Sequence, residues 1–109
     1  MIWNIEFLEE AVKDIKKLDR SVQVQVLKGI QKVSMNPLLA KEGCYGKPLG
    51  NKRGVHLTNL MKIKFRELGI RVVYKVERVD EIMKIIDISA RTDEQVYKEA
   101  VKRREKHDL

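Results

Sequence analysis

The stretch from Met61 to Tyr74 constrains the fold most, because basic and apolar residues alternate along it and a short turn divides it. In its first half the two kinds of residue occupy opposite parities: Lys62, Lys64 and Arg66 against Met61, Ile63 and Phe65. Side chains of a strand point alternately to its two faces, so one face of the sheet is predicted to be cationic. Between Val55 and Val76, five basic residues stand against one acidic residue. A rigid surface of that charge suits a phosphate ligand.

Three consecutive strands are predicted in this half of the chain, over residues 55–66, 70–77 and 81–89. Glu67-Leu68-Gly69 and Arg78-Val79-Asp80 supply the two turns between them. The second and third strands are apolar on both faces near their centres, which is typical of interior strands in a covered sheet. The pattern therefore predicts an antiparallel meander.

The first half of the chain predicts a short strand followed by a helical hairpin. Residues 2–7 alternate so that Trp3, Ile5 and Phe7 face inward, at or near a sheet edge. Apolar residues then recur at helical spacing over residues 8–18 and 22–33, with Ser21 as the expected cap of the second helix. Residues 38–54 hold four of the six glycines and one proline, which indicates a long connection without regular structure.

A last helix is predicted after residue 92, where Thr92 and Gln95 have the spacing of a capping box. The charged run over residues 102–106 is interpreted as the solvated end of this helix. The element order predicts a single α+β domain over residues 1–109, with the helices packed on one sheet face. The other face is then left to Lys62, Lys64 and Arg71.

The composition limits the classes of function that the chain can have. The chain has 109 residues and a net charge of +7, which favours a polyanionic partner. Its single cysteine, Cys44, cannot form an internal disulfide, and the sequence contains neither a long apolar run nor the pattern of a signal peptide. We therefore expect a cytoplasmic protein that does not enter membranes. No His/Cys/Asp cluster has metal-ligand spacing, so we expect no metal and no cofactor.

The chain resembles the RelE family of bacterial and archaeal toxins, in the order of its elements and in runs of residues near its C-terminus. These runs are Lys62-Ile63-Lys64-Phe65-Arg66, Gly69-Ile70-Arg71-Val72-Val73-Tyr74, Ile88-Ser89-Ala90-Arg91 and Val96-Tyr97-Lys98-Glu99-Ala100-Val101-Lys102-Arg103. The resemblance implies a ribosome-dependent endoribonuclease that cuts mRNA in the decoding site. It also implies a cognate antitoxin as partner, with operator DNA as a further partner of the pair.

The family's activity depends on two lysines, two arginines and a tyrosine, which fall here on Lys62, Lys64, Arg71, Arg91 and Tyr97. Relatives of the same fold that poison gyrase, the ParE type, generally lack the full set. A gyrase inhibitor and a basic module that binds RNA or protein without cutting remain the two alternatives.

A ribonuclease of this kind needs cationic groups around one phosphate, because the RNA's own 2′-hydroxyl attacks and negative charge develops on the phosphorus. Arg71 is expected to stabilise that charge and Arg91 the leaving oxygen. Two ammonium groups on one strand face favour loss of a proton from one of them, so Lys62, Lys64 and Tyr97 are the candidates for the base. Tyr97 is also expected to stack on a base or to orient the sugar.

The remaining basic residues are expected to bind RNA rather than to react. On the exposed faces of the two helices they are Lys13, Lys16, Lys17, Lys28 and Lys32. Arg66 is expected to support the active site, with a salt bridge to Glu67 as the alternative. Tyr74 has the opposite parity to Arg71 and is predicted to be core. His56, at the start of a strand, is interpreted as a surface residue and His107 as part of a frayed tail.

Overall fold

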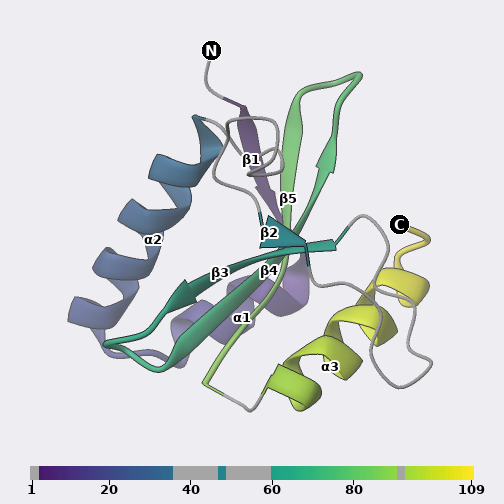
Figure 1. Cartoon of the computed structure of the whole chain (residues 1–109). Coiled ribbons are helices and arrows are strands. Elements are labelled where there is room, and N and C mark those ends of the chain that lie inside the picture. The colour runs from purple at the N-terminus through teal and green to yellow at the C-terminus, as the bar shows by residue number, and fades with distance from the viewer. Residues whose placement is uncertain (1–2, 36–46, 49–59, 91–92) are drawn as a thin grey trace.

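Over the residues that it describes, a computed structural model shows five strands in one sheet and three helices around it (Figure 1). The structure describes residues 3–35, 47–48, 60–90 and 93–109. In chain order the elements are β1 (Asn4–Phe7), α1 (Glu9–Lys16), α2 (Arg20–Ser34), β2 (Lys47–Pro48), β3 (Leu60–Phe65), β4 (Ile70–Glu77), β5 (Ile82–Ser89) and α3 (Asp93–Lys106). Apart from β2, this α+β element order is the one that the sequence predicted.

The sheet has the order β1-β5-β4-β3-β2. Strands β3, β4 and β5 form the predicted antiparallel meander, and β1 pairs with β5 in parallel at the sheet edge. The turn between β3 and β4 ends at Gly69, whose φ of +67° favours glycine. Among the described residues β3 begins at Leu60, and residues 55–59, where the strand was expected to start, lie outside them.

Strand β2 corrects one prediction. Residues 38–54 were expected to lack regular structure, yet Lys47 and Pro48 pair with Lys62 and Met61 of β3. Two residues suffice for an edge strand, and a proline is tolerated there because its missing N–H can face away from the sheet. The rest of this stretch lies outside the described residues, as do Cys44 and His56.

The helical hairpin packs on the sheet face that carries Phe65. Helix α2 buries Val26 and Ile30, and a Cβ at Gly29 would overlap the Phe65 ring, so the helix approaches β3 closely. The first residue before α2 is Asp19, and Ser21 lies exposed within its first turn. The expectation that Ser21 caps this helix is therefore wrong.

Helix α1 continues the line of β1 along β5. The Leu8 N–H donates to the Ile85 carbonyl oxygen, and further along the Ile88 N–H donates to Asp14 Oδ2 at 3.1 Å. Strand β1 pairs with β5 only as far as Ile85. Beyond that point the Asp14 carboxylate of α1 takes the place of a neighbouring strand and accepts the hydrogen bond of a β5 backbone N–H.

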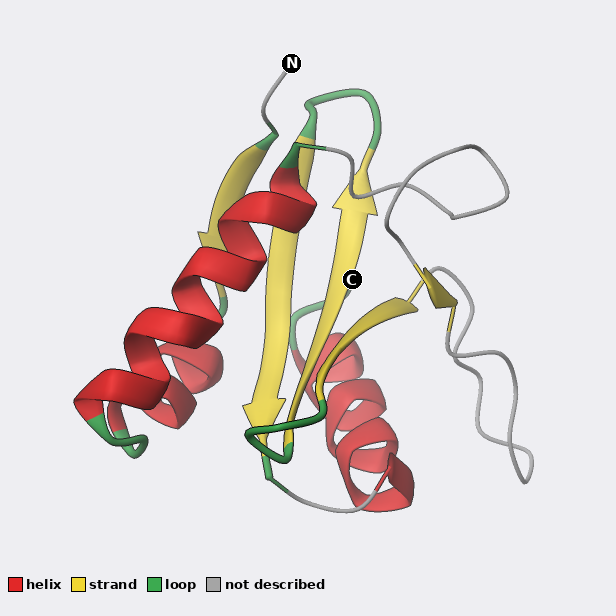
Figure 2. Ribbon diagram, turned by 60° about the vertical axis from the view of Figure 1, so that its left-hand side comes forward, coloured by secondary structure: helices red, strands yellow, loops and turns green. Residues whose placement is uncertain are grey.

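Helix α3 lies on the opposite sheet face from α2: the two helices flank the sheet in Figure 1, and in Figure 2 α2 lies in front of the strands and α3 behind them. Its Tyr97 reaches Lys62, whose side chain has the opposite parity to Phe65 on β3. The sequence had predicted that all helices pack on one face and that the face of Lys62 stays uncovered, which is wrong for α3. The buried stripe Val96, Tyr97 and Ala100 explains the difference, since that apolar surface needs a sheet to pack against.

The C-terminal half of α3 is held by a buried ionic network. Arg103 is 8% exposed, so its assignment to a solvated helix end was wrong. Its guanidinium donates to both carboxylate oxygens of Asp14, at 2.5 and 3.2 Å, and to Asp87 Oδ1 at 3.3 Å. It also donates to Glu99 Oε2 at 2.9 Å and to the Ile86 carbonyl oxygen at 3.0 Å. One side chain thus joins α1, β5 and α3.

Ile86 is available to Arg103 because of an irregularity in the sheet. Val73 pairs with Asp87 and Tyr74 pairs with Ile85, so Ile86 has no partner in the register of β4 and β5. A bulge of this kind leaves one residue outside the ladder, and its polar backbone groups then need other partners. The guanidinium of Arg103 supplies one of them.

Three carboxylates therefore surround one guanidinium, and the pKa values of two of them, Asp87 and Asp14, shift in opposite directions. Burial raises the pKa of Asp87 to about 7, against the opposing charge of Arg103. Burial acts on Asp14 in the same direction, but the hydrogen bonds from Arg103 and the Ile88 N–H hold the pKa of Asp14 below its usual range. A proton on Asp87 reduces the excess of negative charge in the network.

Within the described part of the chain, the helices are too short or too polar to traverse a lipid bilayer.

The free energy of unfolding is expected to fall as the pH rises from 5 to 7. The folded state holds a proton on Asp87 in this range and the unfolded state does not, since the carboxyl's ordinary pKa is 3.8. One such proton gives a slope of up to about 1.4 kcal/mol per pH unit. Asp87→Asn should flatten the slope, because an amide can replace the protonated acid. Urea unfolding at pH 5, 6, 7 and 8 measures both proteins, and equal slopes would contradict this account.

Candidate active site

The pairing of β3 with β4 brings three of the predicted cations to one face. Lys64 lies directly opposite Arg71, and Lys62 lies opposite Val73. Partners in an antiparallel pair project to the same face, so Lys62, Lys64 and Arg71 all point to the side of the sheet that carries α3. The parity argument from sequence is confirmed here, and Tyr74 is fully buried as it predicted.

Helix α3 adds Tyr97 to this face. The ammonium of Lys62 donates to the Tyr97 hydroxyl at 3.2 Å and lies 5.8 Å from the centre of the ring. Tyr97 is 3% exposed, so its ring is covered while its hydroxyl meets a half-buried lysine. Stacking of a base on this ring, one of two expected roles, does not fit such burial. The other role, orienting a sugar or phosphate, calls on the hydroxyl and not on the face of the ring.

A hollow opens where β3 and β4 meet their turn. Its described lining residues are Lys64, Phe65, Arg66, Gly69, Ile70 and Arg71, and its volume is about 270 Å³. Three of these side chains are cationic and none is acidic. The volume lies near the lower end of the range for small-molecule sites, so the hollow suits one phosphate with its sugar rather than a larger ligand. Arg66 joins this hollow, in keeping with the supporting role expected for it.

Arg91, the fifth predicted residue, lies outside the described residues. In the sequence it stands between the end of β5 at Ser89 and the start of α3 at Asp93. The structure thus brings Lys62 together with Tyr97, and Lys64 together with Arg71.

The lysines predicted to bind RNA occupy a separate surface. Lys13 and Lys16 lie in α1, Lys17 directly follows it, and Lys28 and Lys32 lie in α2, all of them exposed. Lys13 also has Glu9 at 3.9 Å, an exposed pair of small energetic weight. Helix α2 packs on the sheet face that carries Phe65, whereas Lys62, Lys64 and Arg71 project from the other face, so the lysines of α2 do not join these three cations.

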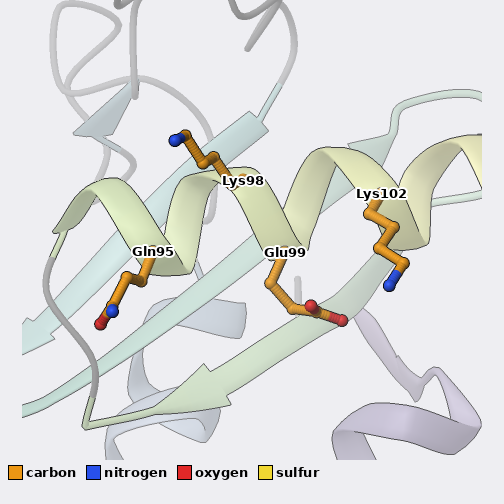
Figure 3. Close-up of a pocket in the computed structure, with 4 residues that line it drawn as sticks. All are labelled: Gln95, Lys98, Glu99 and Lys102. Atoms are coloured by element: carbon orange, nitrogen blue, oxygen red, sulfur yellow. The ribbon is translucent and has the colours of Figure 1, made fainter.

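A second hollow, of about 540 Å³, lies against α3 and was not predicted (Figure 3). Gln95, Lys98, Glu99 and Lys102 line it. Their spacing of three and four residues, at positions 95, 98, 99 and 102, marks one side of a helix and is visible in the sequence. Its mixed charge gives it less attraction for phosphate than the hollow around Arg71.

Among the described residues, no three histidine, cysteine or acidic side chains are grouped in a way that would hold a metal ion.

Comparison with known proteins gives concordant matches. The sequence model of the ParE toxin of the type II toxin-antitoxin system parDE matches residues 5–94. The mRNA interferase toxin RelE of Escherichia coli strain K12 is 31% identical over 103 residues, which cover 94% of this chain and 98% of that protein.

Solved structures agree. A mutant of the E. coli toxin RelE in the free state superposes with a TM-score of 0.72 at 30% identity, covering 94% of this chain and 98% of that one. The toxin chain of the intact E. coli RelBE toxin-antitoxin complex has a TM-score of 0.64 at 26% identity, with coverages of 82% and 96%.

The contact between Lys62 and Tyr97 should be measurable as an energetic coupling. Tyr97→Phe removes the acceptor, and Lys62→Met removes the donor while keeping most of the stem. Each variant, and the two combined, can be compared by urea unfolding. We expect a coupling energy of about 0.5–1.5 kcal/mol, the usual range for one hydrogen bond. Strictly additive effects would show that the two side chains do not interact.

Proposed function

Because the chain belongs to the RelE/ParE family of toxins of type II toxin-antitoxin systems, we propose that it is a ribosome-dependent endoribonuclease that cuts mRNA in the decoding site. The observation that carries this proposal is the Lys62–Tyr97 contact beside the Lys64–Arg71 pair, on one sheet face. These are four of the five groups on which the family's activity depends. The name mRNA interferase, borne by the E. coli relative, supports the same reaction class.

The proposed reaction is a transfer of phosphate within the RNA. The ribose 2′-oxygen attacks phosphorus, the bond from phosphorus to the 5′-oxygen breaks, and the products are a 2′,3′-cyclic phosphate and a 5′-hydroxyl. One proton leaves the 2′-hydroxyl and one reaches the 5′-oxygen. The protein's own side chains can perform each of these steps, so we propose a mechanism that needs no metal ion.

We assign the removal of the 2′-proton to the pair Lys62 and Tyr97. Once this pair has lost one of its own protons it can take up the 2′-proton, and the hydrogen bond of 3.2 Å lets that proton move between the two groups. The Tyr97 hydroxyl is fixed by a buried ring and can orient the ribose before attack. Positioned proton transfer of this kind contributes about 10²–10⁴ in rate.

We assign the phosphate oxygens to Lys64 and Arg71, with Arg66 in support. A guanidinium offers paired donors to two oxygens, and Lys64 adds a second positive charge from the neighbouring strand. Because these charges are in place before the reaction, they stabilise the transition state without reorganisation. Arg91 is assigned to the leaving 5′-oxygen on the resemblance alone.

The proposed partners follow from the same assignment. The substrate is mRNA on the ribosome, which places the protein in the cytoplasm. The solved RelBE complexes of relatives support an antitoxin as partner of this chain, one that would mask the basic face. Binding of operator DNA by such a pair is a further part of the proposal.

Inhibition of gyrase is the second candidate function, because the matching family model describes a ParE toxin. A gyrase poison needs a binding surface and does not need a proton-transfer pair beside a cationic hollow. A basic module that binds RNA without cutting is the third candidate. Cleavage of mRNA on programmed ribosomes, mapped by primer extension, against supercoiling of plasmid DNA by gyrase separates the three.

Arg71→Ala is expected to lower the single-turnover rate of cleavage on programmed ribosomes about a hundredfold, which is typical for loss of one preorganised donor. Its affinity for the ribosome should change little, since many other contacts contribute to binding. Arg78→Ala is the matched control, because Arg78 is exposed in the turn after the far end of β4. If Arg71→Ala weakened binding and cleavage in step, the protein would be a binder.

Lys28→Gln combined with Lys32→Gln is expected to weaken binding to the ribosome and to make that binding less dependent on salt. Each lost phosphate contact should reduce the slope of log K against log salt by about 0.7–0.9. The cleavage rate at saturating ribosome concentration should stay at the wild-type value, because α2 packs on the opposite sheet face from Lys62, Lys64 and Arg71. An unchanged salt slope would show that these lysines do not meet RNA.

A further inference from the structure

Apart from Tyr97 itself, the inner side of α3 has little apolar bulk with which to fix its place on the sheet. Its fully buried apolar residues are Val96 and Ala100, and Val101 is partly buried beside them. Small side chains allow a helix to slide or rotate with modest change in contact. The position of Tyr97, on the same side of the helix, therefore needs a further constraint.

Arg103 supplies that constraint. Residues 96, 100 and 103 follow the helical repeat, so Arg103 extends the buried stripe by one turn, and it points at β5. All three of its nitrogen atoms have partners: Nε bonds Glu99, Nη2 bonds Asp14, and Nη1 bonds Asp14, Asp87 and the Ile86 carbonyl oxygen. A planar guanidinium that is bonded on several sides fixes the rotation of α3 as well as its distance from β5.

Three other contacts hold the C-terminal end of the same helix. Glu10 of α1 lies 3.1 Å from the Lys106 ammonium and 2.9 Å from the His107 ring nitrogen, so His107 is not a frayed tail. The ammonium of Lys75 in β4 donates to the Leu109 carbonyl oxygen. These pairs are more exposed than the Arg103 network. The lysines among them constrain the orientation of α3 less than Arg103 does, because lysine is a flexible point charge.

Tyr97 stands six residues before Arg103, which is about 9 Å along the helix axis. Over that length a helix moves as one rigid piece, so a rotation at Arg103 also displaces the Tyr97 hydroxyl. A displacement of about 1 Å can lower the rate of an oriented reaction about a hundredfold. It would also break the 3.2 Å contact with Lys62.

We propose that Arg103 is a positioning residue, which through Asp14, Asp87 and the Ile86 carbonyl oxygen holds α3 in the register that places Tyr97 on Lys62. Its effect on cleavage rests on the proposed function, whereas its effect on the place of Tyr97 does not. Arg103 does not touch the substrate. It acts through the helix.

Arg103→Lys tests the proposal, because it keeps the charge and loses the fork. The matched control is Lys102→Met, one residue away, whose side chain lines the hollow on α3 and has no part in the buried network (Figure 3). The readout is the ¹³C resonance of the Tyr97 ring, assigned with Tyr97→Phe. Far-ultraviolet circular dichroism and the melting temperature report whether each variant is folded.

In Arg103→Lys we expect the Tyr97 resonance to move toward its position in Lys62→Met, while Lys102→Met leaves it unchanged. On programmed ribosomes the single-turnover rate of Arg103→Lys should fall at least tenfold, with binding within twofold of wild type. Tyr97→Phe should then cost much less in the Arg103→Lys background than in the wild type, because the hydroxyl is already displaced.

A Tyr97 resonance that stays in place in Arg103→Lys overturns the proposal, whatever happens to the rate. If Arg103→Lys fails to fold, Glu99→Gln serves as the milder variant, since it removes one partner of the guanidinium and leaves the others. An unmoved resonance in that variant as well as an unchanged cleavage rate would equally overturn it. If the wild type does not cleave mRNA, the proposed function fails, and the resonance still decides the positioning role.

Discussion

Antiparallel pairing of β3 with β4 is the constraint on which the candidate site depends. It sets Lys64 against Arg71 and puts Lys62 on the same face, so three cations are held by backbone hydrogen bonds rather than by flexible loops. Strand pairing fixes such spacing more firmly than side-chain contacts do, because a shift of one residue would send every side chain to the opposite face. Charge is thus placed before any ligand arrives.

The two sheet faces have different roles. One carries Phe65 and the helix α2 that packs closely on it, and serves stability. The other carries the basic residues and α3, which brings Tyr97 to Lys62. Helix α3 is fixed at one end by a buried guanidinium and carries Tyr97 near the other. The face of the candidate site is therefore assembled from segments distant in sequence, which a few specific polar contacts join.

Local features of the sequence predicted local features of the structure. Alternation identified the basic face, the central burial of β4 and β5 and the role of Tyr74 in the core. Alternation could not predict long-range contacts, because a local pattern carries no information on a partner 74 or 89 residues away. The contacts of Asp14 with Ile88 and Arg103 are of this kind. One signal was present: Asp87 interrupts an isoleucine run, and a carboxyl in an interior strand needs a buried partner.

The central claim is that this face performs chemistry on RNA with the RNA's own 2′-hydroxyl as nucleophile. The most direct measurement uses ribosomes programmed with an mRNA that carries a single 2′-deoxy nucleotide at the mapped cut in the decoding site. The account predicts that the unmodified mRNA is cut to a 2′,3′-cyclic phosphate and a 5′-hydroxyl, and that the 2′-deoxy mRNA stays intact at that position. Cleavage of the 2′-deoxy mRNA at the same bond would contradict it.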